Sequence, residues 1–284
     1  MARDNVTLPY SAREVITEAV HMQLNFTGKT ALVTGSDRNT GAVIARRLSD
    51  SGATVILHSN RSDGSAATAA ATLQNSRAVQ GDIATDEGCE SVMAQLHAQG
   101  VTVDILINNY GTASFATWDS PGTEDWLDMY QKNVLSVVRL VQGIVPQMKR
   151  RQWGRIVNLG TIGSHRPGRI MPHYYAAKSA LANLGVSLAQ ELAGSGITVN
   201  TVSPGLIHTP ELEAGYRARA RKKGWGDDWE DIVRHIIAED FPNPCGRLAT
   251  REEVADLVVF LCSANAGFIN GQNIRIDGGA LSYV

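Results

Sequence analysis

The sequence predicts an α/β fold, a single domain in which helices cover both faces of a doubly wound, seven-stranded parallel sheet. The first observation is that short apolar runs typical of buried strands alternate with segments of helical periodicity from residue 26 onward. The second is that helices connect consecutive strands, and such crossovers require a parallel sheet covered on both faces. No linker rich in proline, glycine or charge interrupts the alternation, so we expect one large domain over residues 26–284.

The expected elements follow one another in a regular order. An apolar run at 31–33 is the first strand, and the turn after it leads into a helix at 42–49. Later strands are expected at 54–58, 78–81, 103–107, 155–159, 198–202 and 273–276. Further helices are expected at 64–73, 86–98, 124–149 with a break inside, 173–193 and 251–262. Because ligands of such sheets bind beyond the carboxyl ends of the strands, we expect the functional site there.

Residues 1–25 lie before this alternation. They lack the apolar core of a secretory signal, and residues 11–23 carry a modest helical stripe of apolar side chains. We therefore expect an N-terminal extension that is either a short helix, packed on the body or on a neighbouring subunit, or a disordered segment.

Composition excludes several classes of function. A hydrophobic content of 43% suffices for a sizeable core, and a formal net charge of -2 gives no reason to expect a nucleic-acid partner. The 3 cysteines are far apart and form no CxxC pair, so we expect neither disulfides nor a metal site, which fits a cytoplasmic protein. No apolar stretch approaches the ~18 residues of a membrane span, so no membrane partner is expected.

Tyr174 and Lys178 are four residues apart in the segment 173–193, where apolar residues recur at helical intervals. That spacing places the phenol and the ammonium on one face of the helix. A free tyrosine titrates near pH ~10, and a fixed positive charge beside it is expected to lower that pKa. The pair is a candidate acid/base, although the same spacing also arises by chance in helices with no catalytic role.

The turn after the first strand, residues 34–41, reads TGSDRNTG. A glycine-rich turn between a strand and a helix aims backbone N–H groups and the positive end of the helix at a phosphate. It is a candidate phosphate-binding turn, with an ordinary strand-to-helix connection as the alternative.

Further motifs follow the other strands. They are GDI at 81–83, ILINNYG at 105–111, an asparagine at 133, GRIVNLGT at 154–161, SPGLIHT at 203–209 and DGG at 277–279. In this order and at these separations, they resemble the motifs of the short-chain dehydrogenase/reductase family from about residue 26 to the C-terminus. The resemblance implies a Rossmann fold and an oxidoreductase that transfers hydride between a nicotinamide cofactor and a carbonyl compound or alcohol.

The resemblance also implies roles for four residues. Tyr174 matches the catalytic tyrosine of the family, Lys178 its lysine, and Asn133 the asparagine that anchors a proton-relay water. Thr161 stands where the family usually has a serine that holds the substrate carbonyl. Threonine keeps the hydroxyl donor, but its methyl group narrows the rotamers of the side chain.

A cofactor site along the carboxyl ends of the strands is implied in the same way. The nicotinamide would lie against Tyr174, with Lys178 bonding its ribose, and the loop after the sixth strand would serve the carboxamide and the phosphates. The other expected contacts are Gly35, Asp37, Arg38, Asn39, Thr40 and Gly41 in the turn, Ser59, Arg61 and Ser62, then Asp82 and Ile83, Asn108, Tyr110 and Gly111, and finally Pro204, Gly205, Ile207 and Thr209.

The residues after the second strand indicate which dinucleotide is used. Ser59 stands where NAD-preferring relatives carry an acidic residue for the ribose 2′-hydroxyl. Arg61 follows it, and Arg38 projects from the turn toward the same pocket, so two guanidinium groups would bind the 2′-phosphate. We expect NADP(H) to be preferred over NAD(H). The alternative is that both arginines are solvated and that NAD is used.

Two departures from the family pattern stand near the cofactor. Asn39 replaces the middle glycine of the turn, and we expect binding to survive because asparagine tolerates unusual backbone angles. Tyr110 replaces a small residue, and its ring is either a filler at the strand end or a substrate contact.

Residues 210–245 form the insertion that covers the substrate in related enzymes. Arg217, Arg219, Arg221, Lys222 and Lys223 make a basic run, which acidic residues follow at once. A solvated lid helix with mixed charges is the simpler interpretation. An anchor for an anionic substrate or a carrier-bound acyl group is the alternative.

We therefore expect an NADP-dependent carbonyl reductase or alcohol dehydrogenase with a small-molecule substrate, assembled as a homotetramer or homodimer. The similarity to bacterial 3-oxoacyl carrier-protein reductases is general, so a 3-oxoacyl thioester is one candidate among several ketones. A pteridine reductase is a second candidate because of HSNRS at 58–62, although those enzymes place an aspartate at the position of Thr161. A non-catalytic NADPH sensor is the alternative from another class, which the intact Tyr174, Lys178 and Asn133 argue against.

Overall fold

The sheet has seven strands, all parallel, in the order β3-β2-β1-β4-β5-β6-β7 in the computed structural model, which describes residues 24–283. The strands are β1 (Thr30–Val33), β2 (Thr54–Ser59), β3 (Ser76–Gln80), β4 (Ile105–Asn108), β5 (Gly154–Leu159), β6 (Ile197–Pro204) and β7 (Asn273–Ile276). The predicted doubly wound α/β fold is confirmed. The helical stripe expected at 11–23 lies outside the described residues.

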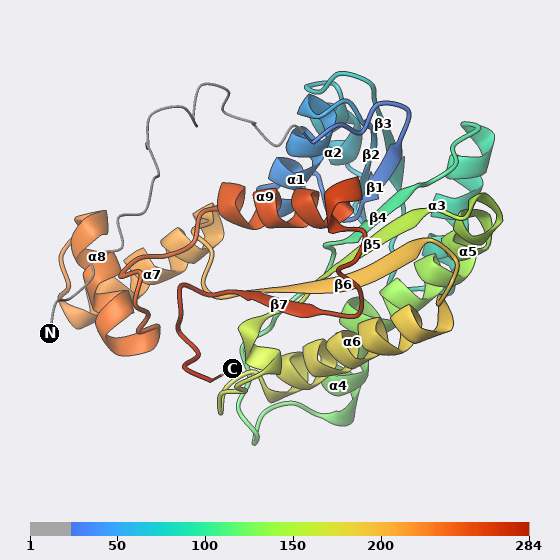
Figure 1. Cartoon of the computed structure of the whole chain (residues 1–284). Coiled ribbons are helices and arrows are strands. Elements are labelled where there is room, and N and C mark those ends of the chain that lie inside the picture. Colours follow the sequence, from blue (N-terminus) through green and yellow to red (C-terminus); the bar gives the residue numbers. More distant parts are fainter. Residues whose placement is uncertain (1–23, 284) are drawn as a thin grey trace, which may run out of the picture.

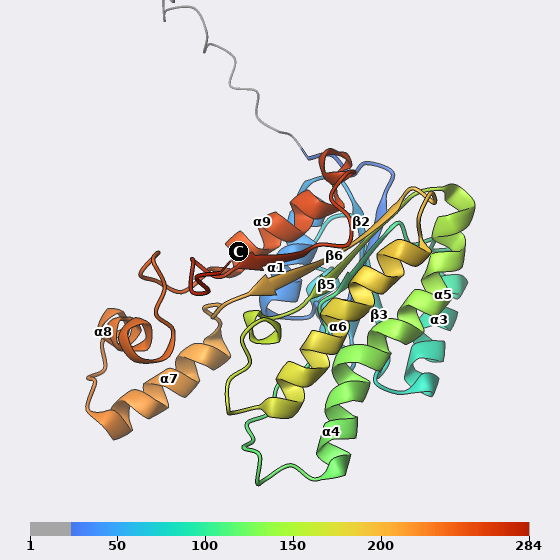
Figure 2. The same cartoon turned by 60° about the horizontal axis from the view of Figure 1, so that its bottom comes forward.

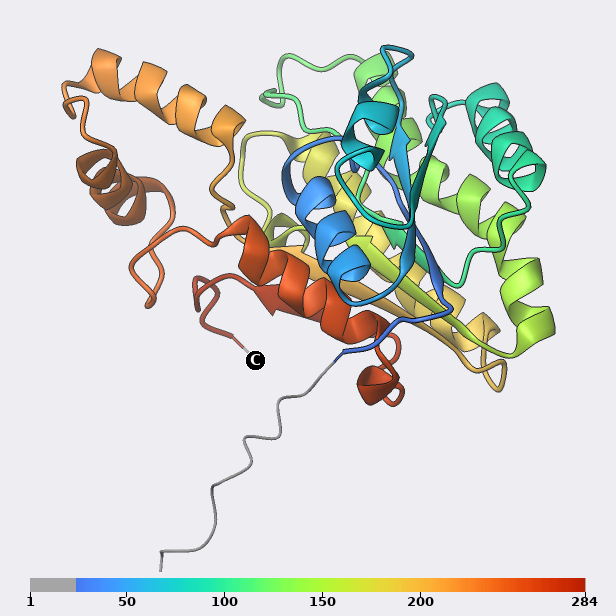
Figure 3. The same ribbon diagram turned by 90° about the horizontal axis from the view of Figure 1, so that it is seen from above.

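Helices cover both faces of the sheet (Figures 1, 2 and 3). One face carries α1 (Asn39–Asp50), α2 (Ser65–Ala70) and α9 (Arg251–Cys262). The other carries α3 (Asp86–Ala98), α4 (Thr123–Tyr130), α5 (Ser136–Arg151) and α6 (Pro172–Glu191). None of the helices in residues 24–283 is both long and apolar enough to cross a membrane.

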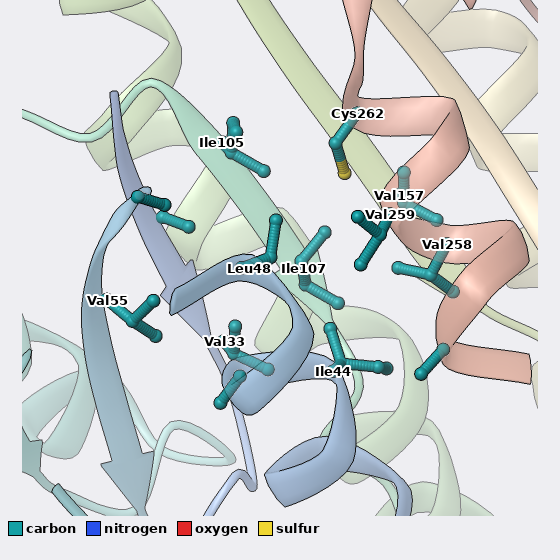
Figure 4. Close-up of a cluster of buried hydrophobic side chains, with 14 of the residues drawn as sticks. Val33, Ile44, Leu48, Val55, Ile105, Ile107, Val157, Val258, Val259 and Cys262 are labelled. Carbon is teal, nitrogen blue, oxygen red and sulfur yellow. The ribbon is translucent and has the colours of Figure 1, made fainter. Parts of the chain in front are cut away.

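A separate apolar cluster fills the space on each face. Figure 4 shows the first, in which Ile44 of α1 and Val258 of α9 meet over Val33 and Ile107 of the two central strands. The second cluster lies between the sheet and α3, α5 and α6. Because both faces are buried, the central strands are apolar throughout, which is why periodicity alone identified them.

The helix expected at 124–149 contains a break, as predicted, although the sequence did not indicate its position. The interruption is a π-helical turn, Gln131–Leu135, between α4 and α5. Such turns are rare and widen the helix locally, and they are frequent at functional sites. This one carries Asn133.

The lid predicted from the sequence consists of α7 (Pro210–Lys223), α8 (Trp229–His235) and a π-helical turn, Ile236–Asp240. It projects from the body beyond the carboxyl end of β6 and is drawn in orange in Figures 1, 2 and 3. The strand order reverses between β1 and β4, so the crevice expected for a ligand opens at the carboxyl ends of these two strands.

Candidate active site

Helix α6 presents Tyr174 and Lys178 at the carboxyl end of β5. The helix begins at Pro172, directly after Met171, whose φ of 57° turns the chain into it. Lys178 is buried, and its Nζ donates a hydrogen bond to the carbonyl oxygen of Leu159 at 2.8 Å. The Nζ atom lies 6.0 Å from the centre of the Tyr174 ring. The two side chains share one helix face, as their spacing predicts.

The structure corrects the expected effect of Lys178 on Tyr174. Burial and, to a smaller extent, the neighbouring Tyr175 together raise the pKa of Tyr174 to about 12, against an opposing effect of the Thr161 side chain. Burial also lowers the pKa of Lys178 to about 8. The expectation that Lys178 lowers the pKa of Tyr174 is therefore wrong. Desolvation of the buried phenol changes this pKa more than a charge several ångströms away does. Near neutral pH, Tyr174 is a protonated phenol and can donate a proton.

Thr161 lies two residues beyond β5, beside the Tyr174 hydroxyl. Its Oγ1 accepts a hydrogen bond from the N–H of Gly163 at 3.2 Å, which fixes the side chain. The other hydroxyls nearby have structural tasks, since Ser164 donates to the carbonyl oxygen of Thr161 at 2.7 Å. The Tyr175 ring packs so closely on Gly163 that a side chain there would overlap it. The Thr161 side chain therefore lies in a fixed position beside Tyr174.

Asn133 lies in the π-helical turn and is completely buried. Its Nδ2 donates to the carbonyl oxygens of Thr112 at 2.9 Å and Met129 at 3.0 Å, whereas its Oδ1 has no partner among the described residues. A β-carbon on Gly111 would lie 2.6 Å from this Oδ1 and 3.1 Å from Lys178 Nζ. Glycine at 111 therefore lets the backbone pass close to the polar space between Asn133 and Lys178.

The glycine-rich turn has the shape of a phosphate cradle. Gly35 and Asn39 adopt left-handed angles, with φ of 58° and 50°, and a side chain on Gly41 would overlap the carbonyl oxygen of Gly35. Asn109 holds the turn, because its Nδ2 donates to the carbonyl oxygens of Thr34 and Gly35 at 2.9 Å each. Asn39 adopts an angle that asparagine tolerates better than most residues, and the survival of cofactor binding at this position stays a prediction. The first N–H groups of α1 point at the space above the turn.

Arg61 lies at the carboxyl end of β2, next to the glycine-rich turn. Its Nη2 is 2.5 Å from Asp37 Oδ2, and its Nε is 3.2 Å from Asp63 Oδ2. Ser59 is buried, and its hydroxyl accepts the N–H of Arg61 at 3.2 Å. The structure thus brings Asp37, Ser59 and Arg61 together as expected, with Arg61 held by two carboxylates.

The side chains of the expected cofactor contacts after β3 and β4 contact other residues of the body in different ways. Asp82 accepts the Tyr110 hydroxyl at 3.5 Å, and the buried Tyr110 ring stands edge-on to His58 at 6.4 Å. Tyr110 is therefore a filler ring at the strand end. Asn108 donates to Asn158 Oδ1 at 2.8 Å inside the body, its own Oδ1 is buried without a partner among the described residues, and Ile83 is buried in the core.

Backbone hydrogen bonds, a parallel bridge and a helix cap hold the loop after β6 in place. Gly205 donates its N–H to the carbonyl oxygen of Ile276 at 3.0 Å, and a side chain on it would overlap the Phe241 ring. Ile207 forms a parallel bridge with Ala249, and Thr209 Oγ1 accepts the N–H of Leu212 at 3.2 Å as the cap of α7. The loop therefore runs along the crevice in a fixed conformation.

The charges of the lid are mostly neutralised within it. Arg217 pairs with Glu213 at 2.7 Å, Arg219 with Asp240, and Lys223 with Glu239 at 2.8 Å. These ion pairs favour the simpler interpretation of a solvated helix with mixed charges.

Sequence reasoning did not single out His173, the residue before Tyr174. Its ring is buried, and its Nε2 is hydrogen-bonded to the Ser114 hydroxyl at 2.9 Å, with the Trp126 ring 6.0 Å away. A histidine adjacent to a candidate catalytic residue was a usable signal. Its partners could not be anticipated because they lie on another loop.

Among the described residues, no group of three or more His, Cys, Asp or Glu side chains is arranged to hold a metal ion.

Comparisons with known proteins agree with this geometry. A family model described as enoyl-(acyl carrier protein) reductase matches residues 35–280. The 3-oxoacyl-[acyl-carrier-protein] reductase of Escherichia coli (strain K12) is 33% identical over 256 residues, which are 90% of this chain and 98% of that protein. An uncharacterized oxidoreductase of Bacillus subtilis (strain 168) is 32% identical over 265 residues, 93% of this chain and 100% of that protein.

Solved structures are similar as well. L-sorbose reductase from Gluconobacter frateurii, complexed with NADPH and L-sorbose, has a TM-score of 0.86 and 32% identity, covering 93% of this chain and 100% of that one. A 3-oxoacyl (acyl-carrier-protein) reductase from Agrobacterium tumefaciens C58 with NADP bound has a TM-score of 0.80 and 31% identity, covering 93% and 99%.

Proposed function

This chain belongs to the short-chain dehydrogenase/reductase family of oxidoreductases, and we propose that it interconverts a carbonyl compound and a secondary alcohol with NADP(H). The observation that carries the proposal is Tyr174, which shares a helix face with the buried Lys178 and lies close enough to the Thr161 side chain for Thr161 to lower its pKa. The glycine-rich turn supports it, because it connects a strand to a helix and packs so tightly that a side chain at Gly41 would overlap the carbonyl oxygen of Gly35.

We assign the proton chemistry to this chain's own residues. In the direction of reduction, Tyr174 donates its proton to the carbonyl oxygen, and the Thr161 hydroxyl orients and polarises that oxygen. NADPH, when bound, supplies the hydride to the carbonyl carbon. Lys178 stabilises the phenolate that Tyr174 becomes, and the polar space between Lys178 and Asn133 offers a route for a new proton. Oxidation of an alcohol reverses these steps.

The cofactor contacts are proposed for the residues that the structure gathers around the crevice. The glycine-rich turn would take the diphosphate, Arg61 and Arg38 the 2′-phosphate, and the loop from Pro204 to Thr209 the nicotinamide end. Preference for NADP(H) is supported by the absence of an acidic residue at Ser59 and by the two similar structures described with NADPH or NADP.

We propose a small ketone or a 3-oxoacyl thioester as the substrate, since the comparisons include reductases of both kinds.

A homotetramer built on the helices that carry Asn133 and Tyr174 is supported by large apolar side chains exposed on them, namely Leu127, Tyr130 and Val186. Light scattering after gel filtration would measure the mass of the assembly. The three cysteines are free, in agreement with a cytoplasmic location.

The proposal is tested by following the absorbance of the nicotinamide. Purified protein is mixed with NADPH or NADH and with a panel of ketones, 3-oxoacyl thioesters, pterins and, in reverse, secondary alcohols. Oxidation of NADPH by at least one carbonyl compound is the expected result. Tight binding of NADPH without turnover of any compound would instead support a non-catalytic sensor, and preferential turnover of pterins would support the pteridine reductase.

A further inference from the structure

The lid, residues 210–240, has an apolar core of its own. Ala220, Ile232 and Ile236 are completely buried, although the lid projects from the body. This core reaches the body at Leu206 and Leu248, in the two segments through which the chain enters and leaves the lid. The ion pairs described above join lid residues to one another. The lid is therefore a preformed unit whose position on the body depends on few contacts.

One side-chain contact joins the start of this unit to the body. Asn39 Nδ2 lies 2.9 Å from both Oε1 and Oε2 of Glu211, near the start of α7. Within residues 24–283, no other side-chain hydrogen bond and no ion pair joins residues 210–240 to the chain before residue 205. The contact therefore connects the glycine-rich turn directly to the lid.

The local chemistry suits this contact. Asn39 supplies an amide donor at this position, and a glycine there would have no side chain to offer. The hydrogen bond from Asn39 lowers the pKa of Glu211, and the charge of Arg38 adds to that effect. The carboxylate is thus ionised near neutral pH, which makes the bond charge-assisted and stronger than a neutral one.

We propose that Asn39 and Glu211 are positioning residues that hold the lid over the phosphate-binding turn. The residue that departs from the family's glycine pattern is then the anchor of the lid. The inference rests on the proposed function in one respect: the turn under the anchor is the site where the cofactor diphosphate binds, so a secured lid slows release of the cofactor.

The contact can be tested in the enzyme without nucleotide by hydrogen–deuterium exchange of residues 205–215, which span the entry to the lid and the first turn of α7. Asn39→Asp keeps a residue that tolerates the left-handed angle but places two carboxylates against each other. Exchange in this segment should rise about three- to tenfold. The double variant N39D/E211Q should return it to the wild-type rate, because the new amide at position 211 can donate to the carboxylate at position 39.

A second pair of variants approaches the contact from the lid. Glu211→Ala should raise exchange in the same segment, whereas Glu211→Gln keeps an acceptor for Asn39 and should change it little. Residues 251–262 of α9 serve as the internal reference, because an intact fold leaves their exchange unchanged. If Asn39→Asp fails to fold, the two substitutions of Glu211 still decide the question.

The proposal is overturned if the exchange of residues 205–215 is the same in Glu211→Ala as in wild type, or if the double variant exchanges as fast as Asn39→Asp alone. A stopped-flow measurement adds the functional readout, since NADPH should dissociate about three- to tenfold faster from Glu211→Ala. If the wild-type protein binds no NADPH, the proposed function fails, while the exchange results still test the anchor by themselves.

Discussion

Removing the Arg61 guanidinium is expected to weaken NADPH binding strongly and NADH binding hardly at all. A charge-assisted contact to the 2′-phosphate is worth about 1.5 to 3 kcal/mol, which is about ten- to a hundredfold in affinity. Two features of the structure change this estimate of the lost affinity, in opposite directions. Arg61 must give up part of its pairing with the nearly buried Asp37 and with the exposed Asp63, and an exposed pair such as the second is worth about 0 to 1 kcal/mol. In Arg61→Ala, however, the Asp37 carboxylate remains in the pocket and repels the phosphate.

Because these two features act in opposite directions, the expected loss of NADPH affinity stays at about ten- to a hundredfold. Dissociation constants for NADPH and NADH, measured by nucleotide fluorescence, give the result directly. Adding Asp37→Asn to Arg61→Ala should recover part of the loss, since it removes the repulsion. Equal losses for both nucleotides, or a wild-type preference for NADH, would show that the 2′-phosphate is not bound at Arg61.

Three further predictions concern the proton donor and the turn. Thr161→Ser should keep its activity, whereas Thr161→Val, which loses the hydroxyl, should lower kcat/KM by about a hundredfold; normal turnover by the valine variant would assign the hydroxyl to another residue. The rate of carbonyl reduction should be steady at neutral pH and fall as the pH rises through about 8, where Lys178 loses its proton. A pH profile without a descending limb in that range would show that the charge of Lys178 is not needed. Gly41→Ala should destabilise the fold by about 1 to 3 kcal/mol and weaken nucleotide binding, because the new methyl group meets the carbonyl oxygen of Gly35. Gly215→Ala, at an open position in α7, is the matched control in thermal denaturation, and equal behaviour of the two would refute the cradle geometry.

Much of the fold was predictable from local sequence. The helix expected at 86–98 has the bounds of α3, since Thr85 caps it and acidic residues fill its first turn. The helix expected at 251–262 matches α9 for the same reason, through the capping box of Thr250 and Glu253. Less exact bounds occur where no cap is present, as in α2, which is shorter than predicted. The π-helical turn around Asn133 was expected only as a break, because its geometry depends on packing.

The candidate site shows where sequence reasoning ends. The helical spacing of Tyr174 and Lys178 and the resemblance of the motifs to those of the family led to Tyr174, Lys178 and Asn133 as candidates. The direction of the pKa shift of Tyr174 was wrong, since it depends on burial by residues distant in sequence. The contact between Asn39 and Glu211 was not expected either, because it joins residues 172 positions apart.

The central claim is that Tyr174 is the proton donor of a hydride-transfer enzyme, and Tyr174→Phe tests it most directly. The substitution removes one oxygen atom and leaves the ring, so the crevice and its cofactor contacts should stay intact. Turnover of the best ketone from the substrate panel, followed through nicotinamide absorbance, should fall by at least about a hundredfold, while the dissociation constant of NADPH changes by less than about threefold. Turnover within a few fold of wild type, with NADPH bound normally, would contradict the account.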